Sequence, residues 1–491
     1  MSQPAEESLG RRTARGMGWA YGSYAGGRLL VLLSTAILAR LLTPEEFGLV
    51  ALALTFTALL DMLRDVGLAE ALIIVPEEEV EELAHTAFTA MAGVGLLLAA
   101  GTAALGPLAA AFYDEPQLTP MMAVLSLTFL FRALGSTHYA LAQKRMDFRA
   151  RTAGEVADVV VRGGAGIGLA LAGAGAWSLI LGYVLGTLAM TLTLWASVHW
   201  RPRPAIDRAH LRRLLGFGTA LTGVSVAGAL LGTVDQLVIG RVLGAAALGL
   251  YSVAARLPEL AIVNLSMVAG QVLFPAFASL DGPALARAFL RAMHHMALLA
   301  LPLAALLGVL AEPAIRVAFG DQWLDAVPVM QVFVLYALVS PITLVCGTVL
   351  KARGKAGLLL RVAVFQVAIV IPAVLLTVDH GITAVAAGHA GAAAIVLLLQ
   401  LGLAMRQLDV SVPAVLRALV GPVTTAAAVG LAAYAADAVV DPPLAALALG
   451  GLAGAAAGAV VLRLVDGAAV RELLGVVLPR LRGSSTPVSA P

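Results

Sequence analysis

The sequence predicts an all-α polytopic membrane protein with about 14 transmembrane helices. Sixty per cent of its 491 residues are hydrophobic, and its mean hydropathy is +0.93. Only 13% of the residues are charged, whereas soluble proteins average about 25%. A soluble protein of this composition would lack the polar residues that cover a surface, so lipid must surround most of the chain.

Fourteen mostly apolar stretches are long enough to cross a bilayer as helices, which takes about 20 residues. The first follows a polar segment without an obvious cleavage site, so we expect an uncleaved helix. The second and eighth are long and polar at one end, which predicts a broken or interfacial piece in each. The predicted spans are 17–42, 47–75, 84–112, 118–142, 152–173, 176–199, 214–240, 247–278, 292–312, 326–350, 357–378, 381–405, 412–436 and 443–464.

The positions of lysine and arginine test this count, because cationic residues are held on the cytoplasmic side of a membrane. With fourteen spans, 25 of the 32 Lys and Arg residues lie on one side. Only Arg40, Arg241 and Arg316 lie on the other, and four more fall inside spans. Miscounting one span would scramble the later loops. The distribution therefore predicts fourteen helices with both termini in the cytoplasm.

Two segments repeat at an offset of 201 residues, from Arg40 to Arg241. Residues 38–49 and 239–250 both carry the pattern R-x-L-x(4)-[FL]-G-L, and both follow a long helix and open the next. The offset pairs helices one to six with helices seven to twelve. It predicts two six-helix lobes related by a pseudo-two-fold axis along the membrane normal, plus two extra C-terminal helices. Duplicated lobes around a cleft are typical of a transporter that opens alternately to each side.

The repeat divides the chain into five predicted segments. They are a cytoplasmic N-terminus (1–16), an N-lobe (17–213), a C-lobe (214–406), helices 13 and 14 (407–465) and a cytoplasmic tail (466–491). Apolar residues recur at helical spacing within 468–482, which is typical of an amphipathic helix lying on the membrane surface. A frayed tail is the alternative.

Ionisable residues inside spans are functional candidates, because a charge at the bilayer centre costs at least about 2.5–3.5 kcal/mol on insertion scales. Four arginines meet this criterion: Arg28, Arg132, Arg162 and Arg256. Arg28 and Arg256 belong to different predicted lobes, so the cleft is a place where they can face each other. The alternative is that these arginines pair with nearby acids and hold helices together. The spacing of Arg162 with Asp158, and of Arg256 with Glu259, fits that alternative.

Carboxylates inside spans are candidates for ion coupling, since they bind Na⁺ or relay protons. Glu155 and Asp158 share one face of the fifth predicted helix. Asp235 stands in the seventh without an obvious local partner, and Asp65 lies with Asp61 near the cytoplasmic end of the second. Structural salt bridges are the alternative role. Apart from coupling to Na⁺ or H⁺, we expect no cofactor and no metal site.

Several short motifs follow one another in a fixed order along the first 350 residues. They are ARLLTPEEFG at 39–48, DVGLAEALI at 65–73, VDQLVIGR at 234–241, LGLY at 248–251, VLFPAFAS at 272–279 and FGDQW at 319–323. In this order and spacing, the chain resembles the oligosaccharide flippases, or polysaccharide transporters. These belong to the multidrug/oligosaccharidyl-lipid/polysaccharide exporter superfamily.

The resemblance implies a transporter that flips polyprenyl-diphosphate-linked oligosaccharide from the inner to the outer leaflet of the cell inner membrane. It would work by alternating access, in capsule, exopolysaccharide or O-antigen assembly. The four interior arginines would bind the diphosphate, because the planar guanidinium makes paired, charge-assisted hydrogen bonds. The implied partners are the bilayer, the lipid-linked glycan, and a glycan polymerase and glycosyltransferases, with no nucleic acid.

Two other functions are alternatives. An ion-coupled multidrug antiporter on the same fold would favour an aromatic and acidic cavity, whereas this chain has four interior arginines and 5% aromatic residues. A membrane enzyme that polymerises glycans would need a sizeable extracytoplasmic loop, and the longest outward connection, near residues 311–327, is short. The sequence also lacks a nucleotide-binding loop, and Cys346 is its only cysteine. We therefore expect a transporter and not an enzyme.

Overall fold

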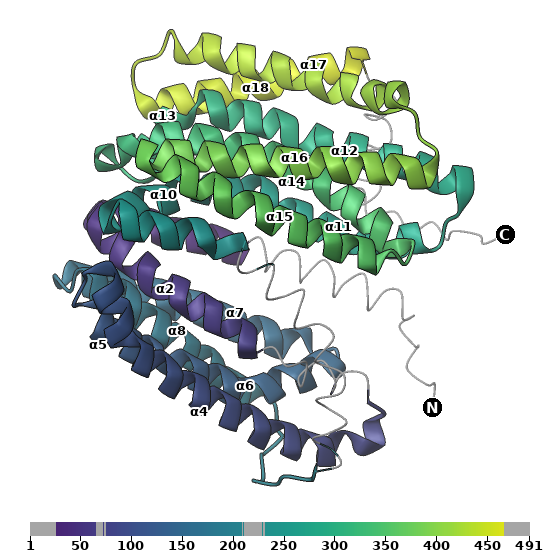
Figure 1. Cartoon of the computed structure of the whole chain (residues 1–491). Helices are drawn as coiled ribbons and strands as arrows, with labels where there is room; N and C mark the ends of the chain where they lie inside the picture. Colours follow the sequence, from purple (N-terminus) through teal and green to yellow (C-terminus); the bar gives the residue numbers. More distant parts are fainter. Residues whose placement is uncertain are drawn as a thin grey trace, which may run out of the picture. The chain divides into compact units, whose positions relative to one another are not determined.

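The computed structural model describes residues 26–64, 75–208 and 231–465, together with residues 72, 210 and 228. Every regular element within these residues is a helix (Figure 1). The prediction of an all-α protein is confirmed. The predicted N-terminal segment 1–16 and the tail that carries the predicted surface helix lie outside the described residues.

Ten helices in the described part of the chain are long and apolar enough to cross a membrane, as a multi-pass membrane protein requires. They are α4 (Val80–Tyr113), α5 with α6 (Leu118–Leu125 and Leu127–Lys144), α8 (Ala176–Ser197), α10 with the π-helical turn η2 (Ala245–Pro258 and Glu259–Val263), α12 (Gly282–Val309), η3 with α14 (Asp321–Ala326 and Val327–Ala352), α15 with η4 (Ala356–Thr377 and Val378–His380), α16 (Ile382–Leu408), α17 (Val412–Asp437) and α18 (Pro443–Val465). The short helices η1 (Glu77–Glu79) and α13 (Ala311–Ala318) lie between spans.

Each of the fourteen predicted spans overlaps a helix, but four of these helices are not among the ten. Charged residues recur along α7 (Phe148–Leu171). The other three, α2 (Pro44–Arg64) and the helices over residues 26–41 and 231–242, each adjoin a segment outside the described residues. The count of fourteen therefore stays a prediction.

The eighth predicted span contains a π-helical turn near its middle, and the broken or interfacial piece expected at one end of it stays a prediction. It runs from α10 through the π-helical turn η2 into α11 (Asn264–Ala278). Pro258 is the last residue of α10 and has no backbone N–H to donate. The wider turn that follows it is a local feature often found at functional sites.

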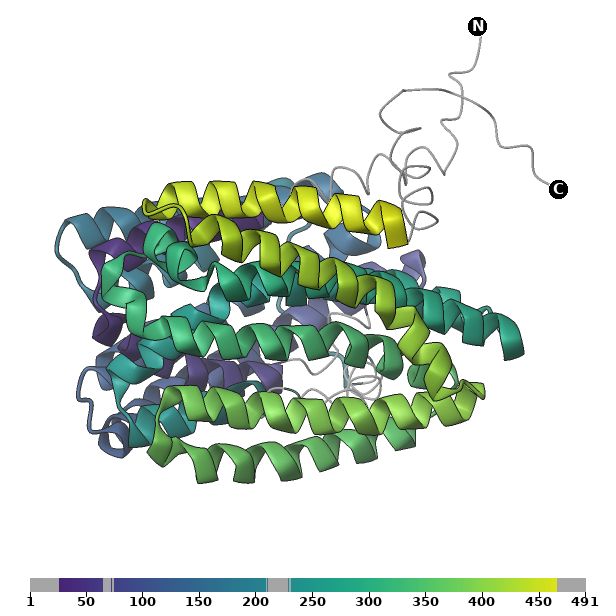
Figure 2. The ribbon, with the colours of Figure 1, turned by 90° about the horizontal axis from the view of Figure 1, so that it is seen from above.

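The chain packs as two units, the first made of Met1–Ser252 and Val367–Val385, the second of Val253–Gln366 and Ala386–Pro491. In the first unit, α7 packs along α8, and α4 packs against α5 and α6. In the second unit, α17 contacts both α12 and α18, and α14 contacts α11 and α12 (Figure 2). The boundaries of the predicted lobes and their symmetry axis stay predictions.

Within the first unit, the two copies of the repeated motif pack on each other. Gly48 of α2 corresponds to Gly249 of α10 under the 201-residue offset, and Pro44 corresponds to Ala245. A Cβ atom on Gly48 would lie 1.7 Å from the carbonyl oxygen of Ala245. A Cβ atom on Gly249 would lie 1.9 Å from the carbonyl oxygen of Pro44. The contact is therefore reciprocal, and each glycine lets its helix touch the first residue of the other.

Replacing either glycine with alanine should force α2 and α10 apart, because the neighbouring atoms are backbone and cannot swing away. We expect G48A and G249A each to destabilise the protein by about 1–3 kcal/mol, measured as a lower melting temperature in detergent. The control is G93A on α4, where a Cβ atom would meet nothing within 4 Å. Equal melting temperatures for all three variants would contradict the reciprocal contact.

Candidate functional site

The polar face of α7 supplies most of the charged side chains of the candidate site. Arg151, Glu155, Asp158 and Arg162 recur at spacings of four, three and four residues, which places them on one face of the helix. The helix begins cleanly because the carboxylate of Asp147 accepts a hydrogen bond from the backbone N–H of Ala150, 3.0 Å away. This face meets α6 and α8, the helices that α7 contacts in the first unit.

Arg162 and Asp158 form an ion pair in which Nη2 donates to both carboxylate oxygens, at 2.6 and 2.8 Å. The pair lies against two glycines of α8. A Cβ atom on Gly186 would lie 2.6 Å from the Oδ1 atom of Asp158, and one on Gly182 would lie 2.8 Å from the carbonyl oxygen of Arg162. Small residues on α8 therefore let α7 approach closely enough to bury most of this pair.

Tyr183 of α8 joins the two interior arginines of the first unit. Arg132 of α6 donates from Nη2 to the Tyr183 hydroxyl at 2.7 Å, and its Nη1 lies 3.2 Å from Oδ2 of Asp61 on α2. The guanidinium carbon of Arg162 lies 4.2 Å from the centroid of the same ring, within cation–π range. Side chains from α2, α6, α7 and α8 thus meet in one cluster, which we call the arginine–tyrosine cluster: Asp61, Arg132, Asp158, Arg162 and Tyr183.

The arginine–tyrosine cluster is compensated in charge yet partly accessible. Its two arginines and two aspartates balance, which lowers the cost of burying them. The side chains of Arg132 and Arg162 are 30% and 33% exposed. The Nε atom of Arg162 has no hydrogen-bond partner among the described residues. The cluster can therefore present guanidinium groups to an anion without leaving a net charge in the span when it is empty.

A second cluster, again made of an arginine, a tyrosine and an acid, lies nearer the N-terminus of α7. Arg151 donates to the Tyr139 hydroxyl at 2.8 Å, and that hydroxyl donates to Glu155 at 3.1 Å. The guanidinium carbon of Arg151 lies 4.8 Å from the centroid of the Tyr139 ring. The predicted acidic pair is thus divided, because Glu155 interacts with Arg151 and Asp158 with Arg162. The coupling role of either carboxylate stays a prediction.

The other predicted site residues lie apart from the arginine–tyrosine cluster. Asp235 is buried, and its partner is distant in sequence: Tyr251, 16 residues further on, donates to its Oδ2 atom at 2.7 Å. Arg256 of α10 lies 3.8 Å from Glu259, and half of its side chain is exposed. Arg28 is exposed on the helix over residues 26–41. Asp65 lies outside the described residues, and the predicted facing of Arg28 and Arg256 stays a prediction.

Four residues of these clusters were absent from the predicted site: Asp61, Tyr139, Arg151 and Tyr183. The chain has only 8 tyrosines, and a buried tyrosine hydroxyl usually finds a hydrogen-bond partner. The position of Tyr183 inside an apolar predicted span was thus the feature of the sequence that could have indicated a polar partner. Asp61 was visible as an acid in the second span, but its partner was not.

Residues 37–328 match a family described as polysaccharide biosynthesis protein. The chain belongs to this family. It is 32% identical over 355 residues to the succinoglycan biosynthesis transport protein ExoT of Rhizobium meliloti (strain 1021), a match that covers 71% of each chain. It is 28% identical over 383 residues to the lipopolysaccharide biosynthesis protein WzxC of Escherichia coli (strain K12), covering 75% of this chain and 76% of that one. The predicted family is confirmed.

Solved structures share the fold of this protein. The lipid II flippase MurJ in its inward closed conformation matches with a TM-score of 0.74 at 13% sequence identity. The match covers 92% of this chain and 100% of that one. At this identity the likeness concerns the fold alone. It confirms the predicted class of polytopic helical membrane protein.

We expect the Arg162–Asp158 pair to be energetically coupled. Arg162→Gln leaves Asp158, whose side chain is 18% exposed, without its cation at a cost of about 1–3 kcal/mol. Adding Asp158→Asn should restore most of that loss, because the double variant contains no unpaired charge. Melting temperatures of both single variants and the double variant in detergent measure the coupling.

The pair Arg353–Asp281, of which both residues are exposed, is the control for this cycle and should couple by no more than about 1 kcal/mol. Strictly additive losses in the Arg162–Asp158 cycle would show that the two side chains do not stabilise each other.

Proposed function

We propose that this protein flips polyprenyl-diphosphate-linked oligosaccharide from the inner to the outer leaflet by alternating access, for capsule, exopolysaccharide or O-antigen assembly. The arginine–tyrosine cluster is the observation that carries the proposal. Two guanidinium groups share one tyrosine inside the spans of the first unit, and a diphosphate is the anion that such forks bind in pairs. Membership of a polysaccharide biosynthesis family supports this class of substrate.

The two ion pairs of the arginine–tyrosine cluster suit a substrate that must be released again. Asp61 and Asp158 hold the guanidinium groups of Arg132 and Arg162 while the site is empty. An incoming diphosphate replaces these carboxylates. The free energy of binding is therefore reduced by the cost of breaking two ion pairs. Affinity therefore stays moderate, and the lipid-linked sugar can leave on the other side.

The same exchange gives ion coupling a physical basis. When the arginines turn to the diphosphate, Asp61 and Asp158 are left without their cations inside a span, which is costly. Uptake of H⁺ or Na⁺ would compensate them. The proposal thus assigns coupling first to Asp158, with Glu155 and Asp235 as further candidates.

The proposal places the protein in the cell inner membrane with both termini in the cytoplasm. The distribution of 25 cationic residues on one side and three on the other supports this orientation. A glycan polymerase and glycosyltransferases are the proposed partners, because a flipped glycan must be built before transport and extended after it.

The test is export of surface polysaccharide in a strain that lacks this protein and carries variants of it. We expect Arg132→Gln and Arg162→Gln each to lower export about tenfold or more through the loss of a paired contact to phosphate. Lipid-linked glycan should accumulate in the membrane. Export by Arg162→Lys should lie between that of Arg162→Gln and that of wild type, because lysine keeps the positive charge but cannot make the paired hydrogen bonds of a guanidinium. Arg28→Ala and Arg256→Ala test the two outlying arginines in the same assay.

The control is Arg353→Gln, which removes an ion pair between two exposed residues and should leave both export and the amount of protein in the membrane unchanged. Full export by both Arg132→Gln and Arg162→Gln would refute the diphosphate site. Full glycan export combined with lost drug resistance would instead favour an ion-coupled multidrug antiporter.

A further inference from the structure

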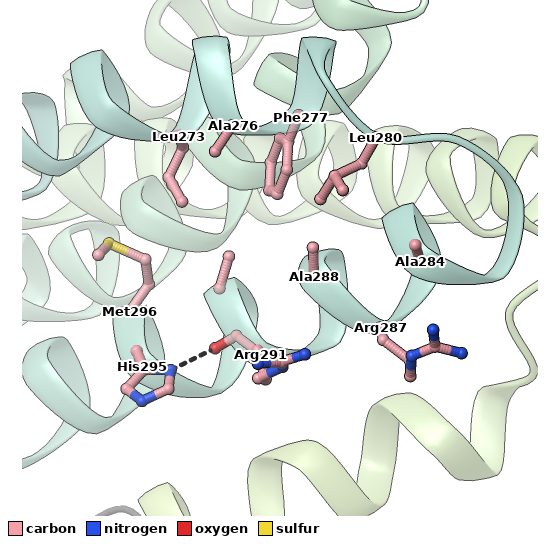
Figure 3. Close-up of a pocket in the computed structure, with 11 residues that line it drawn as sticks. Leu273, Ala276, Phe277, Leu280, Ala284, Arg287, Ala288, Arg291, His295 and Met296 are labelled. Carbon is pink, nitrogen blue, oxygen red and sulfur yellow. Dashed lines mark hydrogen bonds between the residues drawn. The ribbon is translucent and has the colours of Figure 1, made fainter. Parts of the chain in front are cut away.

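An open groove of about 450 Å³ runs along the first half of α12 in the second unit (Figure 3). Leu273 and Phe277 of α11, and Leu280 just after it, face α12 across this groove. The face of α12 contributes Ala284 and Ala288. The volume falls in the range of small-molecule sites, and the lining is mostly apolar.

Three basic side chains line one edge of this groove. Arg287, Arg291 and His295 recur every four residues along α12 (Figure 3), so successive residues are about 6 Å apart along the axis. The His295 ring is held by a 2.7 Å hydrogen bond between its Nδ1 atom and the carbonyl oxygen of Arg291. Both arginines are exposed, and neither makes an ion pair within the described residues.

Among the described residues, the helices packed along the groove supply no acid to compensate these arginines. The helices α11, α12 and α14 contain neither Asp nor Glu, and the only acid of α17 is Asp437, its last residue. The acid nearest in sequence is Asp281, which pairs with Arg353 at 2.6 Å. Within the described residues these helices offer Arg287 and Arg291 no carboxylate, so an anion of another molecule can bind there.

We propose that this groove binds one anionic phospholipid of the inner leaflet. The phosphate lies between Arg287 and Arg291, which offer paired, charge-assisted hydrogen bonds. The apolar face formed by Leu273, Phe277 and Leu280 takes the first part of an acyl chain. Basic pockets between membrane-spanning helices on the cytoplasmic side bind acidic headgroups in this way.

The size and position of the groove favour a phospholipid over the lipid-linked glycan. A volume of about 450 Å³ accommodates a phosphate with part of one chain, whereas a diphosphate carrying several sugars is much larger. The groove also lies in the second unit, whereas the arginine–tyrosine cluster belongs to the first. The proposal is therefore independent of the proposed transport function.

The experiment measures the lipid that the purified full-length protein retains. The protein is placed in nanodiscs that contain equal amounts of phosphatidylglycerol and phosphatidylcholine, and bound lipid is identified by native mass spectrometry. We expect wild type to retain phosphatidylglycerol preferentially, and R287Q/R291Q to bind it about thirtyfold more weakly, from two lost surface cations. Arg316→Gln, which removes one cation from α13, is the control and should behave as wild type.

A second variant blocks the groove and keeps both arginines. Ala276 lines the groove and is exposed, so Ala276→Trp should fill it without disturbing the core, and phosphatidylglycerol retention should fall. Unchanged retention in R287Q/R291Q, or equal binding of the two lipids by wild type, would overturn the proposal. A polyprenyl phosphate that displaces phosphatidylglycerol from the wild-type groove when both are supplied would overturn the choice of a phospholipid.

Discussion

A guanidinium group inside a membrane span requires a counter-charge within hydrogen-bonding distance, and the interior of the first unit is arranged around this requirement. Arg132 and Arg162 come from different helices, and their partners come from two more. Tyr183 gives both cations a favourable contact. Its ring faces the guanidinium of Arg162, and its hydroxyl accepts a hydrogen bond from Arg132. The cluster thereby links α2, α6, α7 and α8 through charged and polar contacts.

Close helix packing is the second condition, and glycine provides it in two places. On α8, Gly182 and Gly186 bring the backbone of α7 near enough for Asp158 and Arg162 to lie flat against it. At the start of α2 and α10, Gly48 and Gly249 bring two helix ends into backbone contact. Helices in lipid gain little from apolar burial against each other, so close van der Waals packing and interhelical hydrogen bonds have to hold them.

The sequence predicted the helices well because the bilayer sets their length. The predicted span 118–142 corresponds to α5 and α6, which end at Lys144, and the span 176–199 to α8. It did not predict the break at Ser126 between α5 and α6, because a one-residue deviation leaves the apolar pattern intact.

The site was predictable only where contacts follow helical spacing. The pair Arg162–Asp158 is one turn apart and was foreseen as a structural ion pair. The partners of Arg132 are 71 and 51 residues away, and only the packing of whole helices brings them together. Asp235 illustrates the same limit over a shorter distance, since Tyr251 is 16 residues away on the next helix.

The arginines of this protein divide according to the solvent that surrounds them. Arg132 and Arg162 of the arginine–tyrosine cluster are paired with Asp61 and Asp158 of the same chain, as a charge surrounded by bilayer hydrocarbon requires. Arg287 and Arg291, near the start of α12, have no acid along the helices packed on them. Near the end of a membrane-spanning helix, water and lipid headgroups can supply a counter-charge that hydrocarbon cannot. An arginine near a helix end can remain without an acid of the same chain at little cost in stability, whereas an arginine in mid-span cannot. The proposed lipid contact can therefore do without an internal acid. The proposed diphosphate site needs one, because it must stay stable when no substrate is bound.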